Sequence, residues 1–364
     1  MATFTEAQRA LGELFIIGFS GLELAEETSA FISQAGIGGV ILFSLNADTP
    51  AQIAELTNEI KACRNDTPML ISVDHEGGRV QRFKKGFTKI PEAAAIAAMN
   101  SPKLAFEISE IVAKELKAVG INLNFCPVAD IATNPKNPVI GNRSYGITEE
   151  AVSKYVTAVI RGHLVHGVQV CVKHFPGHGD TSVDSHLALP SVDTPLEVLR
   201  EREFKPFQKA FKARCGMVMT AHILNTKIDS QFPATLSKIF LQDILRKELR
   251  YEKLIVSDDL DMKAIADNYG AEEAPRLALE AGCDMLIYRT EATARHGYES
   301  LIKALENQTL SAETVLRSVE RVMAFKREHL AMCPPVSIPS VSAQLATTEH
   351  LAIIERVAER SKRG

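Results

Sequence analysis

The sequence of 364 residues contains no tryptophan and no excess of basic residues, since 41 Lys and Arg face 45 Asp and Glu. The net charge of −4 argues against a nucleic-acid-binding protein, which needs a basic surface. No apolar run approaches the roughly 18 residues of a membrane-spanning helix. Residues 1–9 lack the basic and apolar segments of a signal peptide. We therefore expect a cytoplasmic protein that binds neither nucleic acid nor membrane.

Cysteine is also sparse, with six residues scattered along the chain and no CxxC pair. Several, such as Cys126 and Cys171, lie inside apolar runs, which is typical of reduced, buried thiols rather than of a disulfide framework. A thiolate zinc site is not expected without paired cysteines. No G-x-G-x-x-G segment follows an apolar run, which argues against a dinucleotide site. We expect no cofactor and no metal.

What the sequence does contain is a series of short apolar runs, separated by longer amphipathic stretches. Their Leu-rich and β-branched composition, without alternation, is typical of parallel strands that are buried on both faces. The runs cover residues 14–17, 39–43, 69–73, 123–128, 169–172, 217–220, 254–256 and 285–288.

The stretches between these runs have the spacing of amphipathic helices. Thr49, followed by Pro50, is the expected N-cap of the first, and Ser101 opens the second in the same way. Alternating strands and helices predict right-handed βαβ units, and eight such units over about 330 residues favour a (β/α)₈ barrel of the TIM type over an open doubly wound sheet. The predicted helices cover residues 50–62, 101–118, 148–166, 197–213, 236–249, 272–281 and 292–306.

The predicted organisation is a single α/β domain with a short C-terminal extension. We assign residues 1–335 to the barrel, because no composition change interrupts them. A Pro- and Ser-rich stretch after Cys333 ends the regular pattern. Residues 336–364 then form a tail or a capping helix, with one helical pattern over 347–360. We expect a monomer.

Charged residues follow six consecutive predicted strands, beginning with the third. Active sites of (β/α)₈ barrels lie at the carboxyl ends of the strands, so these residues predict a site there. They are Asp74, His75, Glu76, Arg79 and Arg82 after the third strand, Asp130 and Arg143 after the fourth, Lys173 and His174 after the fifth, His222 after the sixth, Asp258, Asp259 and Asp261 after the seventh, and Arg289 after the eighth.

Several of these residues also have structural interpretations. Glu76 and Arg79 are expected to form an ion pair at the rim of the barrel. Asp130 either caps the following loop or belongs to the site. His222 is either a packed histidine or a substrate contact. We expect His178 to tie the loop after the fifth strand to the barrel.

Asp258 follows its strand directly, at a depth where its carboxylate would face the pocket. Asp259 must point away from it, because successive side chains of an extended segment diverge. Asp261 is predicted to cap a short helical run over residues 262–266. One acid therefore faces the pocket, and the other two have structural roles.

The segment from Lys173 to His186 combines three His, two Asp and one Lys with Pro and Gly that favour a loop. Asp184 can accept a proton from the imidazole of His186, which raises the basicity of the other ring nitrogen. An aspartate nucleophile beside a His–Asp pair that transfers protons would support displacement at an acetal carbon. The surrounding Lys and Arg donors suit a polyhydroxylated substrate, and therefore a sugar.

Over residues 10–330 the chain resembles the β-N-acetylglucosaminidases of glycoside hydrolase family 3, specifically the group that recycles peptidoglycan. The resemblance rests on residues 73–83, 124–130, 141–145, 173–186 and 257–260. The run K-H-F-P-G-H-G-D-T-x-x-D-S-H is the most specific of these, because it separates this group from the glucosidases of the same family.

The resemblance implies a retaining exo-hydrolase that removes terminal N-acetylglucosamine from N-acetylglucosaminyl-anhydro-muropeptides in the cytoplasm. It implies that Asp258 is the nucleophile and that His186, oriented by Asp184, is the acid/base, in place of the usual second carboxylate. It further implies that the sugar ring is held by Asp74, Arg82, Arg143, Lys173 and His174.

Two alternatives remain open at this point. A metal-dependent barrel hydrolase could use the pairs His178/Asp180 and Asp184/His186 as ligands, although all four residues share one loop. A sugar-binding barrel without turnover is the second alternative, and every proposed catalytic position is filled.

Overall fold

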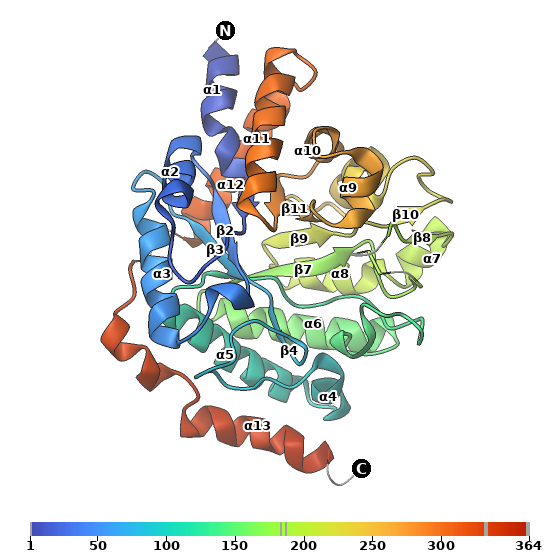
Figure 1. Ribbon diagram of the computed structural model, residues 1–364. Helices are drawn as coiled ribbons and strands as arrows, with labels where there is room; N and C mark the ends of the chain where they lie inside the picture. The colour runs from blue at the N-terminus through green and yellow to red at the C-terminus, as the bar shows by residue number, and fades with distance from the viewer. Residues whose placement is uncertain (1, 183, 186–187, 331–333, 362–364) are drawn as a thin grey trace.

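The computed structural model describes residues 2–182, 184–185, 188–330 and 334–361. Eight parallel strands form a closed barrel in the order β1, β12, β11, β9, β7, β6, β3, β2 (Figure 1). This confirms the predicted (β/α)₈ barrel and every predicted strand. Their bounds are β1 Phe15–Ile17, β2 Gly39–Leu42, β3 Leu70–Val73, β6 Leu123–Asn124, β7 Gln169–Phe175, β9 Met217–Thr220, β11 Leu254–Asp259 and β12 Met285–Tyr288.

Helices surround the barrel, and two small two-stranded sheets, β4 with β5 and β8 with β10, lie in its loops. The small strands are β4 His75–Gly77, β5 Val80–Gln81, β8 Ser191–Val192 and β10 Leu224–Asn225. The helices of the first half are α1 Ala2–Ala10, α2 Glu26–Ala35, α3 Pro50–Ala62, α4 Ala93–Ala98, α5 Pro102–Ala118 and α6 Glu149–Leu164. Those of the second half are α7 Leu196–Glu201, α8 Phe204–Lys212, the π-helix η5 Ile239–Glu248, α9 Lys263–Tyr269, α10 Glu273–Ala281, α11 Glu291–Glu306, α12 Ala312–His329 and α13 Thr348–Ser361.

The predicted N-caps are confirmed at two helices. Thr49 Oγ1 accepts a hydrogen bond from Gln52 N at 3.2 Å, and Ser101 Oγ accepts one from Leu104 N at 3.2 Å. A proline follows each cap at the first helical position, where its missing N–H removes no intrahelical bond. Sequence alone therefore locates the start of α3 and of α5.

One predicted helix is wrong in its continuity. Residues 197–213 form two helices, α7 and α8, separated at Arg202 and Glu203. Pro206 explains the break, because a proline in a helix interior would remove the hydrogen bond to residue 202 and clash with its carbonyl. A new helix that begins at Phe204 places the proline in the first turn, where it is tolerated. Helices α1, α2, α4 and α12 have no counterpart among the predicted ones.

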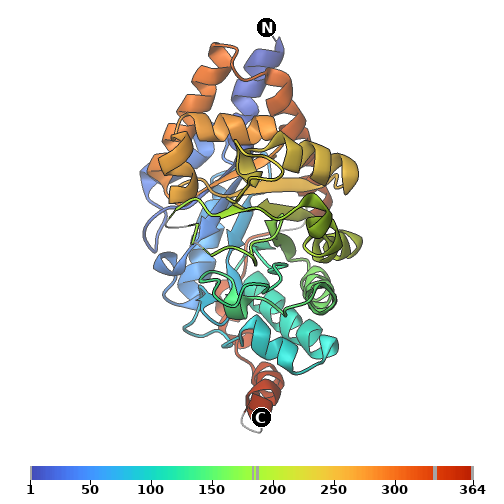
Figure 2. The ribbon, with the colours of Figure 1, turned by 90° about the vertical axis from the view of Figure 1, so that its right-hand side faces the viewer.

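The C-terminal segment lies against the outside of the barrel as a helix. Figures 1 and 2 place α13 and α1 at opposite ends of the molecule, with α13 beside α5. The predicted helix over 347–360 is confirmed as α13. The division of the chain between residues 335 and 336 stays a prediction. In the described part of the chain, no helix combines the length and apolarity needed to cross a membrane.

A buried carboxylate holds this segment in place. Glu115, on α5, accepts hydrogen bonds from Ala346 N and His350 Nδ1, each at 2.8 Å, and from Thr88 Oγ1 at 2.5 Å. Its side chain is 3% exposed. The C-terminal helix is therefore attached through a charge-assisted contact that water does not weaken.

We predict that His350→Ala lowers the free energy of unfolding by about 1–3 kcal/mol, because a buried carboxylate loses one donor. Glu355→Ala, at an exposed position of the same helix, should change it by less than about 0.5 kcal/mol. Urea denaturation of both variants and the wild type measures the difference. Equal stabilities of the two variants would contradict the role given to this contact.

Candidate active site

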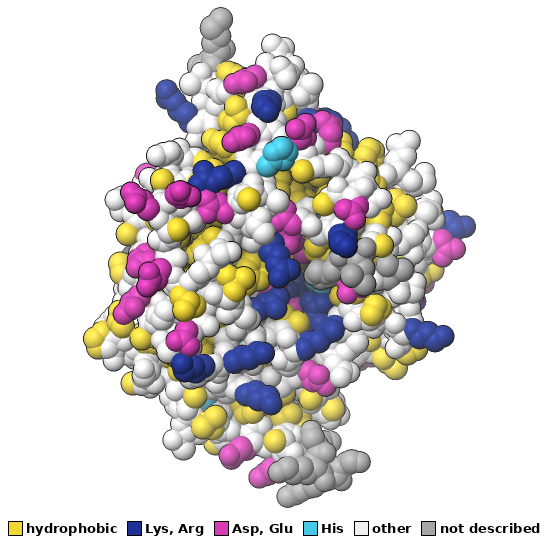
Figure 3. Space-filling view, viewed as in Figure 1, with side chains coloured by type: hydrophobic (Ala, Val, Ile, Leu, Met, Phe, Trp, Pro, Cys, Tyr) yellow, Lys and Arg dark blue, Asp and Glu magenta, His cyan; other side chains and the backbone are white. Residues whose placement is uncertain are grey.

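The carboxyl ends of the strands open into a cavity of about 580 Å³. Figure 3 shows acidic and basic side chains gathered in a hollow at the centre of this face. The cavity brings together residues from strands far apart in the sequence. His186 lies outside the described residues. The other predicted site residues all line the cavity, namely Asp74, Arg82, Arg143, Lys173, His174, Asp184 and Asp258.

Lys173 lies at the centre of an ion-pair network in the wall of this cavity. Strand β7 extends to Phe175, beyond its predicted end, so Lys173 is part of a strand rather than of a loop. Its Nζ lies 2.7 Å from Asp74 Oδ1 and 2.7 Å from Glu76 Oε1, and the residue is 2% exposed. Burial alone would lower the pKa of Lys173, but the two carboxylates hold it above its ordinary value. The ammonium therefore stays charged.

Glu76 connects this lysine to Arg143. Arg143 Nε and Nη2 donate to the two carboxylate oxygens of Glu76 at 2.9 and 2.7 Å. Burial would raise the pKa of Glu76, but Arg143 and Lys173 hold it far below its usual range. The predicted ion pair between Glu76 and Arg79 is wrong, because Arg79 donates instead to the carbonyl oxygens of Val139 and Pro138. The loop after β6 carries Arg143 to Glu76.

Asp74 is shared between two cations. Its second carboxylate oxygen lies 3.4 Å from Arg82 Nη2, and its first is bound to Lys173. Arg82 also lies over the ring of Phe43, with its guanidinium carbon 5.8 Å from the ring centroid. The carboxylates and cations on this side of the cavity offer both acceptors and donors to hydroxyl groups of a ligand.

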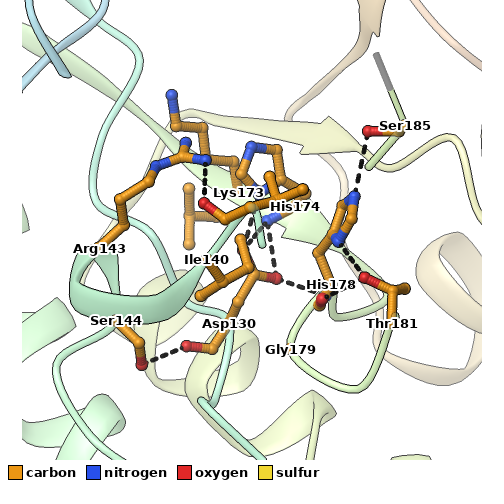
Figure 4. Close-up of polar contacts among 12 residues, drawn as sticks. Asp130, Ile140, Arg143, Ser144, Lys173, His174, His178, Gly179, Thr181 and Ser185 are labelled. Atoms are coloured by element: carbon orange, nitrogen blue, oxygen red, sulfur yellow. Dashed lines mark hydrogen bonds and ion pairs between the residues drawn. The ribbon is translucent and has the colours of Figure 1, made fainter. Parts of the chain in front are cut away.

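Asp130 organises the loop that follows β7, as Figure 4 shows. It is fully buried, and its carboxylate lies 2.7 Å from His174 Nδ1 and accepts a hydrogen bond from His178 N at 2.6 Å. Burial would raise the pKa of Asp130, but His174 and the hydrogen bonds hold it below its ordinary value. A bridge pairs Val128 with Lys173, which brings the two strand ends together. Of the two roles that sequence left open, these contacts favour the structural one, because Asp130 fixes the loop and does not itself line the cavity.

The ring of His178 cross-links the same loop internally, whereas the predicted attachment to the barrel runs through its backbone N–H to Asp130. Its Nδ1 lies 2.8 Å from Thr181 Oγ1 and its Nε2 lies 3.2 Å from Ser185 Oγ (Figure 4). The carbonyl oxygen of Ser185 accepts a further bond from Ala264 N at 3.3 Å. Burial lowers the pKa of His178 to about 4, so its ring is neutral near pH 7. These contacts hold Ser185, and with it Asp184, at the cavity.

Asp258 lies near the end of β11 and faces the cavity. Burial by itself would raise the pKa of Asp258, but the imidazoles of His222 and His174 hold it below its ordinary value. His222 is 1% exposed, and its two ring nitrogens lie 2.8 Å from Thr235 Oγ1 and 2.9 Å from the carbonyl oxygen of Asp259. Asp258 is therefore an ionised carboxylate that lines the cavity.

The two following acids have structural contacts. Asp259 Oδ1 accepts hydrogen bonds from Asp261 N and Arg289 N, each at 3.0 Å. The prediction that Asp261 caps the run 262–266 is wrong, because its carboxylate binds Thr290 N at 3.2 Å and Thr293 Oγ1 at 2.7 Å instead. Strands β11 and β12 are neighbours, so the end of β11 lies beside the start of α11.

Two of the four residues considered as metal ligands, His178 and Asp180, have other partners. Asp180 lies 3.3 Å from Arg202 Nη2 and accepts hydrogen bonds from the hydroxyls of Thr133 and Thr194 at 3.4 and 3.3 Å. Both ring nitrogens of His178 are hydrogen-bonded as well. Within the described ranges, no three His, Cys, Asp or Glu side chains are grouped as a metal ion would require. This geometry does not favour the metal-dependent alternative.

Comparison with known proteins gives consistent matches over most of the chain. Residues 7–325 match the sequence model of the glycosyl hydrolase family 3 N-terminal domain. A β-hexosaminidase of Methylococcus capsulatus is 40% identical over 304 residues, which cover 82% of this chain and 88% of that protein. A β-hexosaminidase of Neisseria meningitidis is 39% identical over 282 residues, covering 75% and 77% respectively.

Solved structures agree with these sequence matches. A glycoside hydrolase family 3 β-N-acetylglucosaminidase from Paenibacillus sp. has 38% sequence identity and a TM-score of 0.90, covering 97% of this chain and 68% of that one. NagZ from Neisseria gonorrhoeae, in complex with N-trifluoroacetyl-D-glucosamine, has 30% identity and a TM-score of 0.77, covering 95% and 97%.

We predict that Asp259→Asn makes stability less sensitive to pH. Burial, followed by the charges of Asp261 and Asp258, raises the pKa of Asp259 to about 7 from 3.8. Folding therefore binds a proton between pH about 4 and about 7, and the contribution of this carboxyl to the free energy of unfolding falls as pH rises through that window. Asparagine keeps an acceptor oxygen and has no charge to desolvate.

The gain in free energy of unfolding on substitution should therefore be larger at pH 8 than at pH 5, which urea denaturation at the two values measures. Asp267→Asn, at an exposed position of α9, is the control and should show no such difference. A gain for Asp259→Asn that is the same at both pH values would contradict the raised pKa.

Proposed function

The chain belongs to glycoside hydrolase family 3 as a β-N-acetylhexosaminidase, and we propose that it is a retaining exo-β-N-acetylglucosaminidase acting on peptidoglycan fragments in the cytoplasm. The observation that carries the proposal is an ionised Asp258 at the end of a barrel strand, in the same cavity as Asp184 and as the charged network around Lys173. This arrangement combines a nucleophile with a polar sugar site.

In the proposed reaction, the carboxylate of Asp258 attacks the anomeric carbon of the terminal N-acetylglucosamine. The bond to the leaving oxygen breaks, and His186 donates a proton to that oxygen while Asp184 stabilises the imidazolium. A covalent glycosyl-enzyme results. His186 then takes a proton from water as the water attacks the anomeric carbon, which releases the sugar with retained configuration.

The proposed sugar site lies in the same cavity as Asp258. Asp74 accepts hydrogen bonds from sugar hydroxyls, and Arg82, Arg143, Lys173 and His174 contribute donors or orient them. The buried contacts of Lys173 and His174 support this role, because their side chains are held in place before a ligand arrives. A pre-oriented site loses less entropy on binding.

The substrate class rests on the resemblance of residues 173–186 to the peptidoglycan-recycling group and on the likeness to NagZ from Neisseria gonorrhoeae. Incubation with N-acetylglucosaminyl-anhydro-muropeptides, beside chito-oligosaccharides, tests it directly. We expect mass spectrometry to show release of N-acetylglucosamine from both and faster release from the muropeptides. Binding by calorimetry without release of any product would contradict the proposal and favour a non-catalytic sugar-binding barrel.

We predict that Asp258→Ala abolishes hydrolysis of 4-nitrophenyl N-acetyl-β-D-glucosaminide, because alanine has no carboxylate to form the covalent intermediate. His186→Ala should slow cleavage about 10²- to 10⁴-fold for poor leaving groups and far less for activated phenols, which need no proton. Asp193→Asn, at an exposed position, is the matched control and should keep full activity. Wild-type activity in Asp258→Ala would overturn the assignment of the nucleophile.

A further inference from the structure

The cations of the cavity fall into two groups. Lys173, Arg143 and Arg82 each lie within ion-pair distance of Asp74 or Glu76. Arg289 lines the same cavity but differs from these three. Within the part of the chain that the structure describes, no carboxylate lies within ion-pair distance of its guanidinium, although its charge acts on Asp261, and its side chain is exposed at the mouth. Its five N–H donors are therefore available to a ligand.

The backbone holds Arg289 beside the nucleophile. Arg289 directly follows β12, and its N–H donates to Asp259 Oδ1 at 3.0 Å. Asp259 is the neighbour of Asp258, so both strand ends are fixed relative to each other. Asp258 and Arg289 line the same cavity, so a leaving group that projects from an anomeric carbon at Asp258 past the end of β12 would meet Arg289.

An aromatic ring fixes the side chain of Arg289. Its guanidinium carbon lies 5.5 Å from the ring centroid of Phe43, which follows β2. Gly18, between them at the end of β1, makes this approach possible, because a Cβ at this position would lie 2.2 Å from the Arg289 carbonyl oxygen and 2.9 Å from Phe43 Cε2. A stacked guanidinium loses less side-chain freedom when it binds a ligand.

A second cation makes an anion at this place more favourable. Arg82 lies over the same Phe43 ring, and its Nε is buried without a hydrogen-bond partner. Its one ion-pair contact to Asp74, at 3.4 Å, is long. Two guanidinium groups beside one ring would both attract an anion that binds near them. The terminal N-acetylglucosamine itself is neutral and cannot supply that anion.

We propose that Arg289 is a specificity-determining residue that binds a carboxylate on the leaving group of the substrate. A guanidinium fork matches a carboxylate with two parallel hydrogen bonds. The inference rests on the proposed function, in which the leaving group is a muramic-acid unit. The carboxylate is either the lactyl group of that unit or a carboxylate of its attached peptide, and both present the same chemistry to Arg289.

The test compares kcat/KM for Arg289→Gln, Arg289→Lys and the wild type on matched substrates. These are N-acetylglucosaminyl-anhydro-N-acetylmuramic acid with and without peptide, the same disaccharide with its lactyl group amidated, and chitobiose, whose leaving group is neutral. We expect Arg289→Gln to lower the ratio of kcat/KM for the free acid to that for chitobiose about 10- to 100-fold, mainly through KM. Arg289→Lys should give an intermediate loss, because it keeps the charge without the fork.

Comparison of these substrates shows whether the carboxylate belongs to the lactyl group or to the peptide. A loss that disappears when the lactyl group is amidated assigns the lactyl carboxylate, and a loss seen only with peptide assigns the peptide. In the wild type, added salt should raise KM for the acidic substrates only. Arg317→Gln, which removes an exposed charge on α12 outside the cavity, is the control for net charge and should leave the ratio unchanged.

Equal losses on chitobiose and on the acidic disaccharide would overturn the inference, because Arg289 would then act on the shared sugar or on the fold. An unchanged ratio in Arg289→Gln would overturn it as well. In both cases the wild type still hydrolyses the substrates, so the proposed function stands. A wild type that releases N-acetylglucosamine from none of them overturns the proposed function and the inference together.

Discussion

The buried ammonium of Lys173 is the interaction on which the rest of the site depends. An isolated charge at this depth would cost several kcal/mol, so the lysine is compatible with the fold only because Asp74 and Glu76 lie on either side of it. The same requirement fixes Arg143, which completes the charge balance of Glu76. Strand β3, the hairpin after it, strand β7 and the loop after β6 are thereby held in one arrangement. These charged groups are therefore held in fixed positions in the wall of the cavity.

Sequence predicted the barrel because its strands are buried on both faces, which leaves uninterrupted apolar runs that are easy to recognise. It also predicted which residues collect at the carboxyl ends, since this depends only on where each strand stops. Partners within the site were harder to predict. Proximity in sequence favours Arg79 for Glu76, whereas the true partner is 67 residues away on a loop whose path is set by tertiary contacts. Proximity in sequence likewise assigned Asp261 to the helical run that follows it. Its carboxylate is instead bound by the start of α11, which follows the neighbouring strand β12.

Asp130 shows how one buried acid can couple two functions. Its two oxygens reach His174, which belongs to the proposed sugar site, and the backbone of His178, which holds Ser185 next to the proposed proton-transfer pair. Neither contact is visible from spacing, because it arises where the ends of β6 and β7 lie side by side. The loop after β7 is thus fixed at its base by a residue from another strand. The proposed sugar site and the proposed proton-transfer pair are therefore both attached to Asp130.

Adjacent acids at the end of β11 show how the structure separates charge states that sequence cannot distinguish. Asp258 and Asp259 are both partly buried. The imidazoles of His222 and His174 favour the ionised form of Asp258. Asp259 lies beside Asp261 and has a pKa of about 7. Two full negative charges on neighbouring residues would repel each other in this site. Near pH 7 the proton therefore resides on Asp259 for much of the time. That division leaves the negative charge on Asp258, as its proposed role as nucleophile requires.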